Sequence, residues 1–158
     1  MVVIFIKNRL IFTITALILI FLTAFTERCI SYRKPSDISR IEIEKGEFLF
    51  RYNSNCVIDF ENNTITSKSG YSYEDNEETI RHFSEEDKEN FVSQLNIYGF
   101  FSWQDYVNLN VHDDGYTDFL VVYNDGTHKE TGCHNAYPDT YDAVWEAIWK
   151  LRSNSYEN

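Results

Sequence analysis

The chain has 158 residues, of which 16% are aromatic, and a formal net charge of −11. The aromatic content excludes an intrinsically disordered chain, and the roughly 130 residues after the N-terminal segment suffice for one domain with a substantial core. All 25 acidic residues and 12 of the 14 basic ones come after residue 25, so this part carries a net charge of −13 and repels nucleic acid.

An apolar segment from Leu10 to Phe25, without charge, glycine or proline, dominates the N-terminal part of the chain. A helix of this length reaches about 24 Å, and Lys7 and Arg9 can extend to the headgroups of a slightly thinned bilayer. The segment therefore predicts a single-pass membrane anchor. A cleaved signal peptide is the alternative, in which Lys7 and Arg9 form the charged region before the apolar one.

The residues after this segment bear on its processing and orientation. Ala24-Phe25-Thr26 matches a cleavage site only loosely, and Thr26-Glu27-Arg28 lacks the small residues that lipid attachment at Cys29 requires. Basic residues near both ends weakly favour a cytoplasmic C-terminal part under the positive-inside rule. Signal anchors this close to the N-terminus commonly export the C-terminal part of the chain, so we expect an extracytoplasmic domain, with secretion after cleavage as the alternative.

Composition divides the chain into four parts. Residues 1–27 are the hydrophobic anchor or signal segment, 28–38 a polar connector, 39–152 a single acidic α+β domain, and 153–158 a tail expected to fray. Within the domain we expect an antiparallel β-sheet packed against two α-helices. The class is therefore α+β, preceded by a transmembrane helix.

The first half of the domain alternates apolar and polar residues between turn residues, which predicts an antiparallel meander. The expected strands are residues 41–44, 48–52, 56–60, 64–68 and 71–73. Turns are expected at Lys45-Gly46, at 53–55 and at 61–63, and the acidic stretch 74–78 is expected to be a loop.

Ser84 begins the first predicted helix, because its hydroxyl can cap free N–H groups and three acidic residues come next in the first turn. Apolar residues recur at positions 91, 92, 95 and 98, and Gly99 can end the helix. The aromatic residues directly after it are expected in the core: Phe100, Phe101, Trp103 and Tyr106.

Residues 119–123 form a strand that is apolar on both faces, which predicts a central position in the sheet. Asn124-Asp125-Gly126 is a strong signal for a tight hairpin, with residues 127–131 as the partner strand. Pro138 suits the first turn of a final helix. The buried stripe of that helix is expected to contain Tyr141, Val144, Ile148 and Leu151, widened by Trp145 and Trp149.

This C-terminal part resembles an uncharacterised group of small secreted or membrane-anchored bacterial proteins. The resemblance rests on Asp114-Gly115, Tyr123-Asn124-Asp125-Gly126 and Gly132-Cys133-His134-Asn135-Ala136-Tyr137-Pro138, followed by the amphipathic helix. The group has an aromatic residue shortly after the first Asp-Gly, and Tyr116 or Phe119 stands there here. The resemblance covers roughly the last 45 residues. It implies a small α+β domain and no activity or catalytic residue.

Three cysteines are present, and their spacing fits neither a metal site nor a dithiol redox motif. In an oxidising compartment Cys56 and Cys133 could form one bridge, leaving Cys29 near the membrane. Two buried free thiols are the alternative, since free cysteine behaves as a small hydrophobic residue.

The candidate polar cluster is His112-Asp113-Asp114, with His128 and His134 further along the chain, and these are ligand types for zinc or another divalent ion. Their spacing does not define a site, and the two Asp-Gly pairs are explained as turns. Cys133 and His134 are adjacent, which is the wrong relation for a thiol and its base. A Gly-x-Ser-x-Gly elbow and a glycine-rich phosphate loop are both missing from the sequence.

The sequence thus favours a protein that is not an enzyme and needs no cofactor. We expect a membrane-anchored binding or inhibitor module whose acidic, aromatic-rich domain meets a basic protein or a cell-envelope partner. A small metal-dependent enzyme or metal-binding protein centred on His112, Asp114 and His134 is the alternative. An accessory subunit of other membrane helices has little support, because the apolar segment lacks a small-xxx-small pair.

Overall fold

The structure is a computed structural model that describes residues 32–47, 52–70, 77–107 and 115–156. The chain divides into two compact units, Met1–Tyr32 and Arg33–Asn158, and the second contains all the helices and strands given below. The apolar segment and the strand expected at residues 71–73 lie outside the described residues. Within the described ranges, neither α-helix has the length and hydrophobicity that a bilayer crossing requires.

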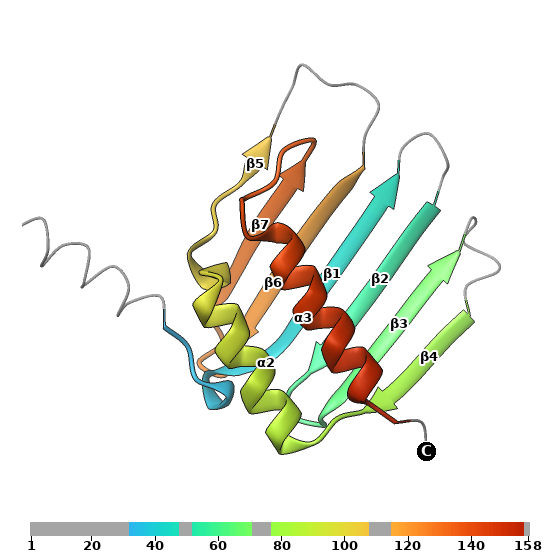
Figure 1. The fold of residues 1–158 in the computed structure, drawn as a ribbon, viewed down its shortest axis with the longest axis vertical. Helices are drawn as coiled ribbons and strands as arrows, with labels where there is room; N and C mark the ends of the chain where they lie inside the picture. The colour runs from blue at the N-terminus through green and yellow to red at the C-terminus, as the bar shows by residue number, and fades with distance from the viewer. Residues whose placement is uncertain (1–31, 48–51, 71–76, 108–114, 157–158) are drawn as a thin grey trace, which may run out of the picture. The chain divides into compact units, whose positions relative to one another are not determined.

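Seven strands form one sheet in the order β4-β3-β2-β1-β6-β7-β5 (Figure 1). All neighbouring strands are antiparallel except β5 and β7, which run parallel, so the sheet is mixed and not purely antiparallel as expected. The predicted α+β class with two helices is confirmed. The strands are β1 (Ile38–Glu47), β2 (Tyr52–Asp59), β3 (Thr64–Gly70), β4 (Glu77–His82), β5 (Tyr106–Val107), β6 (Tyr116–Tyr123) and β7 (His128–His134).

The turns predicted at Lys45-Gly46 and at residues 53–55 are instead parts of the long strands β1 and β2. Lys45 and Gly46 belong to β1, where they pair with Ser54 and Asn53 of β2 and with residues 117 and 116 of β6. Pairing on both sides of β1 satisfies its backbone groups and outweighs the local preference of Gly46 for a turn. The turn at residues 61–63 and the hairpin at 124–126 are confirmed, with Gly126 at a φ of 82°.

The acidic stretch expected to be a loop contains the start of β4, an edge strand that the sequence did not indicate. Glu78 lies opposite Lys68 of β3, and their side chains form an ion pair of 2.7 Å. The tail expected to fray also reaches this strand, because Tyr156 exchanges two backbone hydrogen bonds with His82, at 2.8 and 2.9 Å. The C-terminal residues therefore help to cover the edge of the sheet.

Helices α2 (Glu85–Ile97) and α3 (Tyr141–Asn154) lie on the same face of the sheet (Figure 1). Ser84 caps α2 as predicted: its Oγ accepts from the Asp87 amide at 3.1 Å. Asp87 in turn contacts the Ser84 hydroxyl at 2.6 Å and accepts from Asn154 at 3.0 Å. These hydrogen bonds, that of the Ser84 hydroxyl above all, lower the pKa of the Asp87 carboxyl.

The core lies between the sheet and the helices. Phe100, in the 3-10 turn η2 (Phe100–Ser102), packs edge to face on Trp103 and Phe119, with ring centroids 5.1 and 5.4 Å apart. Lys129 of β7 secures this segment by donating to the carbonyls of Phe101 and Trp103, at 2.8 and 2.6 Å. The expectation that the aromatic cluster belongs to the core is confirmed. A second 3-10 turn, η1 (Pro35–Asp37), precedes β1.

Replacing the α2 cap should destabilise the domain. We expect Ser84→Ala to lower the free energy of unfolding by about 1 kcal/mol, because one N-terminal amide loses its acceptor. Urea unfolding followed by circular dichroism measures the change. Ser93→Ala, at an exposed position in the same helix, is the matched control and should change stability by less than about 0.5 kcal/mol. Equal effects of the two substitutions would contradict the role given to the cap.

Candidate functional site

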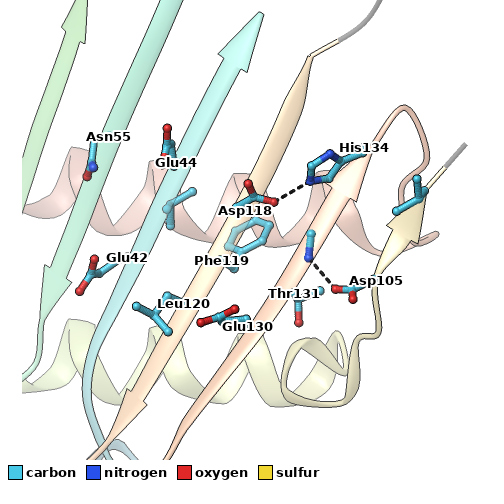
Figure 2. A pocket seen from close by; sticks show the side chains of 13 residues that line it. Glu42, Glu44, Asn55, Asp105, Asp118, Phe119, Leu120, Glu130, Thr131 and His134 are labelled. Carbon is cyan, nitrogen blue, oxygen red and sulfur yellow. Dashed lines mark hydrogen bonds and ion pairs between the residues drawn. The ribbon is translucent and has the colours of Figure 1, made fainter. Parts of the chain in front are cut away.

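The face of the sheet opposite the two helices is not covered by any described element, and it holds a groove of about 520 Å³. Strand register brings the groove residues together: Glu42 pairs with Leu120 of β6, and Glu44 pairs with Asp118. Figure 2 shows these side chains on the side of the sheet away from both helices. Among the described residues, the lining is Glu42, Ile43, Glu44, Asn55, Asp105, Val107, Asp118, Phe119, Leu120, Glu130, Thr131, Gly132 and His134.

A polar network joins three strands at one end of this groove. His134 Nε2 of β7 lies 2.8 Å from Asp118 Oδ1 of β6, a pair that Figure 2 shows as a dashed line. The His134 ring stacks on the Tyr116 ring, with centroids 5.8 Å apart, and the Tyr116 hydroxyl donates to Glu44 Oε1 of β1 at 2.9 Å. Each member is thus oriented by a neighbour on the adjacent strand.

Two glycines make room for this network. A Cβ atom at Gly46 would lie 2.7 Å from Cζ of the Tyr116 ring, so the ring can cross β1 only because residue 46 has no side chain. A Cβ at Gly132 would lie 3.0 Å from both Asp118 Oδ1 and His134 Nε2. Glycine within a strand often marks such a close approach of another group, and here it permits the aromatic ring and the histidine to lie flat on the sheet.

Asp105 closes the groove on the side of β5. Its Oδ1 accepts a hydrogen bond of 2.9 Å from the Gly132 amide, directly before the residues of β7 that pair with β5. Like Glu42 and Glu44, Asp105 therefore presents carboxylate oxygens along the floor of the groove.

Negative charge dominates the lining of the groove. Of the described lining residues, five are carboxylates and one is a histidine, the carboxylates being those of Glu42, Glu44, Asp105, Asp118 and Glu130. Arg40, outside the lining, offsets one of these charges through an ion pair of 2.6 Å with Glu42. His134 and Asp118 are about half exposed, with side-chain accessibilities of 45% and 48%, so both are reachable from solvent. Because carboxylates and a tyrosine hydroxyl can hold an ammonium or guanidinium group by charge-assisted hydrogen bonds, the arrangement is suited to binding a cationic group.

Cys133 does not contribute a nucleophile to this site. It neighbours His134 in β7 and therefore points to the opposite face, where it is completely buried. Burial, reinforced by the negative charges of Asp118 and Asp105, raises the pKa of its thiol to about 11. The thiol is therefore protonated and enclosed at neutral pH, so Cys133 offers no thiolate to the His134–Asp118 pair.

The candidate metal ligands and the cysteines are the other residues that the sequence singled out. Of His112, Asp114 and His134, only His134 lies among the described residues, and within those residues no three His, Cys, Asp or Glu side chains could hold a metal ion. Cys56 and Cys133 are free thiols. They lie on β2 and β7, three strand spacings or roughly 14 Å apart, whereas a disulfide needs Cα atoms within about 7 Å. The bridge considered from the sequence does not form.

Sequence reasoning did not find most of the groove residues. The alternation Ile41-Glu42-Ile43-Glu44 marked a half-buried strand, so it placed both glutamates on one face of the sheet. Nothing in the sequence indicated that Asp118 and His134 would lie beside them, because these partners come from strands more than 70 residues further along the chain. No family model matches the chain, and no curated protein matches it either. The geometry of the groove therefore carries the functional inference.

The contact between Gly46 and the Tyr116 ring can be tested by a double-mutant cycle. We expect Gly46→Ala to lower the free energy of unfolding by about 1–3 kcal/mol, because the new methyl group displaces the ring. In the background Tyr116→Val the same substitution should cost at least about 1 kcal/mol less, since the ring that it displaces is gone. Urea unfolding of the four proteins measures this difference. Additive effects would show that the two residues are not coupled.

Proposed function

We propose that this protein is a membrane-anchored binding module whose uncovered sheet face receives a cationic segment of a basic partner protein. The groove with five carboxylates and one histidine is the observation that supports this proposal. Binding requires no chemical step and therefore no nucleophile beside His134. The thiol of the adjacent residue, Cys133, is buried on the other face of the sheet.

The geometry favours binding of a chain segment over binding of a compact ion. The groove is open and runs across β1, β6 and β7, from Glu42 to His134. Its carboxylates come from four separate segments of the chain, so their charges are spread along the groove and are not focused on one point. Successive lysine or arginine side chains can therefore each meet a different carboxylate, which adds affinity and steers association.

The alternative proposed from the sequence is a metal-binding protein or metal-dependent enzyme. His134 is available for it on the open face, where it is oriented by Asp118 as a metal-ligating histidine often is by a carboxylate. His112 and Asp114 lie outside the described residues, so this alternative stays a prediction. The acidic groove needs neither residue, and for that reason we favour the binding module.

The charge of the groove can be tested with deca-lysine as a defined cationic probe. The full chain is placed in nanodiscs of zwitterionic lipid, and its affinity for the probe is measured by fluorescence anisotropy. We expect Glu42→Gln/Glu130→Gln to weaken binding about three- to tenfold, because each exposed ion pair contributes about 0.2–1 kcal/mol. The difference should shrink as salt is added.

The matched control for this measurement is Glu86→Gln/Glu89→Gln, which removes the same charge from exposed positions on α2. The control should change the affinity less than twofold if the groove binds the probe. Equal weakening by both variants would mean that deca-lysine responds only to the overall charge, and the proposal for this face would fail.

We further propose that the apolar segment 10–25 holds the domain on the outer side of a membrane. Cells expressing the chain with a C-terminal tag should retain the tag in the membrane fraction, and protease added to intact spheroplasts should remove it. Release of the tag into the medium would indicate a cleaved signal peptide. A membrane-bound tag that resists the protease would place the domain in the cytoplasm and contradict the proposed orientation.

A further inference from the structure

A second groove lies on the helix-bearing face, between α3 and strands β1, β2 and β3. It has a volume of about 500 Å³ and is lined by aromatic, aliphatic and charged side chains of α3 together with small and basic side chains of the sheet. Figure 1 shows α3 crossing in front of these strands. Because the sheet separates this groove from the acidic one, the two form distinct sites.

The groove exists because side-chain sizes do not match across this part of the core. On the sheet side, Ser54, Cys56 and Ser67 are small, whereas α3 contributes the large rings of Trp145 and Trp149. Val144 and Leu151 fill the neighbouring part of the interface and are fully or almost fully buried. Trp149 was expected in the buried stripe, but it is 58% exposed and forms the outer wall of the groove.

Two cations reach into this groove over the tryptophan rings. Lys45 Nζ of β1 lies 5.5 Å from the centroid of the Trp145 ring, and Arg152 Cζ lies 5.3 Å from that of Trp149. Both side chains are half-buried, and among the described residues neither forms an ion pair with a carboxylate. In a chain with a net charge of −11, Lys45 and Arg152 place two positive charges beside the tryptophan rings of this groove.

The cations of this groove are less exposed than its carboxylates, because Lys45 and Arg152 are half-buried. Asp142 and Glu146 also line it, but both are exposed on the outer surface of α3. Burial raises the pKa of the Cys56 thiol, while the hydrogen bond with Ser67 and the positive charge of Arg152 oppose this shift. The groove thus combines an aromatic wall with two half-buried cations and two exposed carboxylates.

We propose that this groove binds a small carboxylate with an apolar body, held by Lys45 and Arg152 and packed against Trp145. Arginine and lysine provide charge-assisted hydrogen bonds to a carboxylate, and the planar guanidinium can bind both of its oxygens. The aromatic wall and the small sheet residues accommodate the apolar part, as in most small-molecule sites. A cationic ligand would instead meet Lys45 and Arg152 and be repelled.

The test uses 3-phenylpropionate as the probe, with the neutral 3-phenylpropanol and the cationic 3-phenylpropylammonium as matched compounds. Two of the three tryptophans of the chain line the groove, so the intrinsic fluorescence of the full chain in nanodiscs reports occupancy. We expect the carboxylate to bind at least about tenfold more tightly than the alcohol. Attraction to the acidic protein as a whole would favour the ammonium compound, so a preference for the carboxylate identifies the groove.

Four substitutions locate the binding. Lys45→Gln and Arg152→Gln should each bring the affinity for 3-phenylpropionate toward that of the alcohol, whereas Arg40→Gln removes the same charge from the opposite face and should have no effect. Ser67→Leu fills the hollow and should abolish binding of the carboxylate. Circular dichroism shows whether each variant is folded. If Ser67→Leu does not fold, Lys45→Gln and Arg152→Gln decide the outcome.

The proposal is overturned if the alcohol or the ammonium compound binds as tightly as the carboxylate. It is also overturned if Arg40→Gln weakens binding as much as Arg152→Gln does, or if folded Ser67→Leu still binds the probe. None of these results bears on the acidic groove, because deca-lysine binding is measured on the other face of the sheet.

Discussion

The pairing of β1 with β2 on one side and with β6 on the other is the interaction on which the rest of the structure depends. It joins the N-terminal meander to the C-terminal hairpin in one sheet. Its register sends Ile41 and Ile43 to the helices and Glu42 and Glu44 to the open face. Because a shift of one residue would exchange these sets, burial of the isoleucines also determines where the carboxylates lie.

Both helices cover the same face, and this makes the two faces of the sheet chemically different. The covered face is closed by aromatic packing around Phe100 and Phe119 and by the two carbonyl contacts of Lys129. The open face instead carries hydrogen-bonded side chains, laid flat over Gly46 and Gly132. Polar groups can line that face at little desolvation cost. Solvent can hydrogen-bond those polar atoms that have no partner in the network.

The same division accounts for the two proposed sites. The open face gathers carboxylates from four segments into a groove suited to a cationic chain. The covered face leaves a groove where α3 meets small sheet residues, and Lys45 and Arg152 lie there over two tryptophan rings. The sheet itself separates these cations from the carboxylates of the open face, so an anion and a cationic segment would contact different charged side chains.

Local patterns in the sequence determined the α+β class, the cap of α2 at Ser84, the hairpin at residues 124–126 and the membership of the aromatic cluster in the core. Each depends on residues close together in the chain. The continuation of β1 through Gly46, the parallel strand β5 and the attachment of Tyr156 to β4 were decided by pairing between distant segments. The same is true of both grooves, because a local pattern can place Glu44 on a face of the sheet, but only the register of three strands puts it beside Tyr116 and His134.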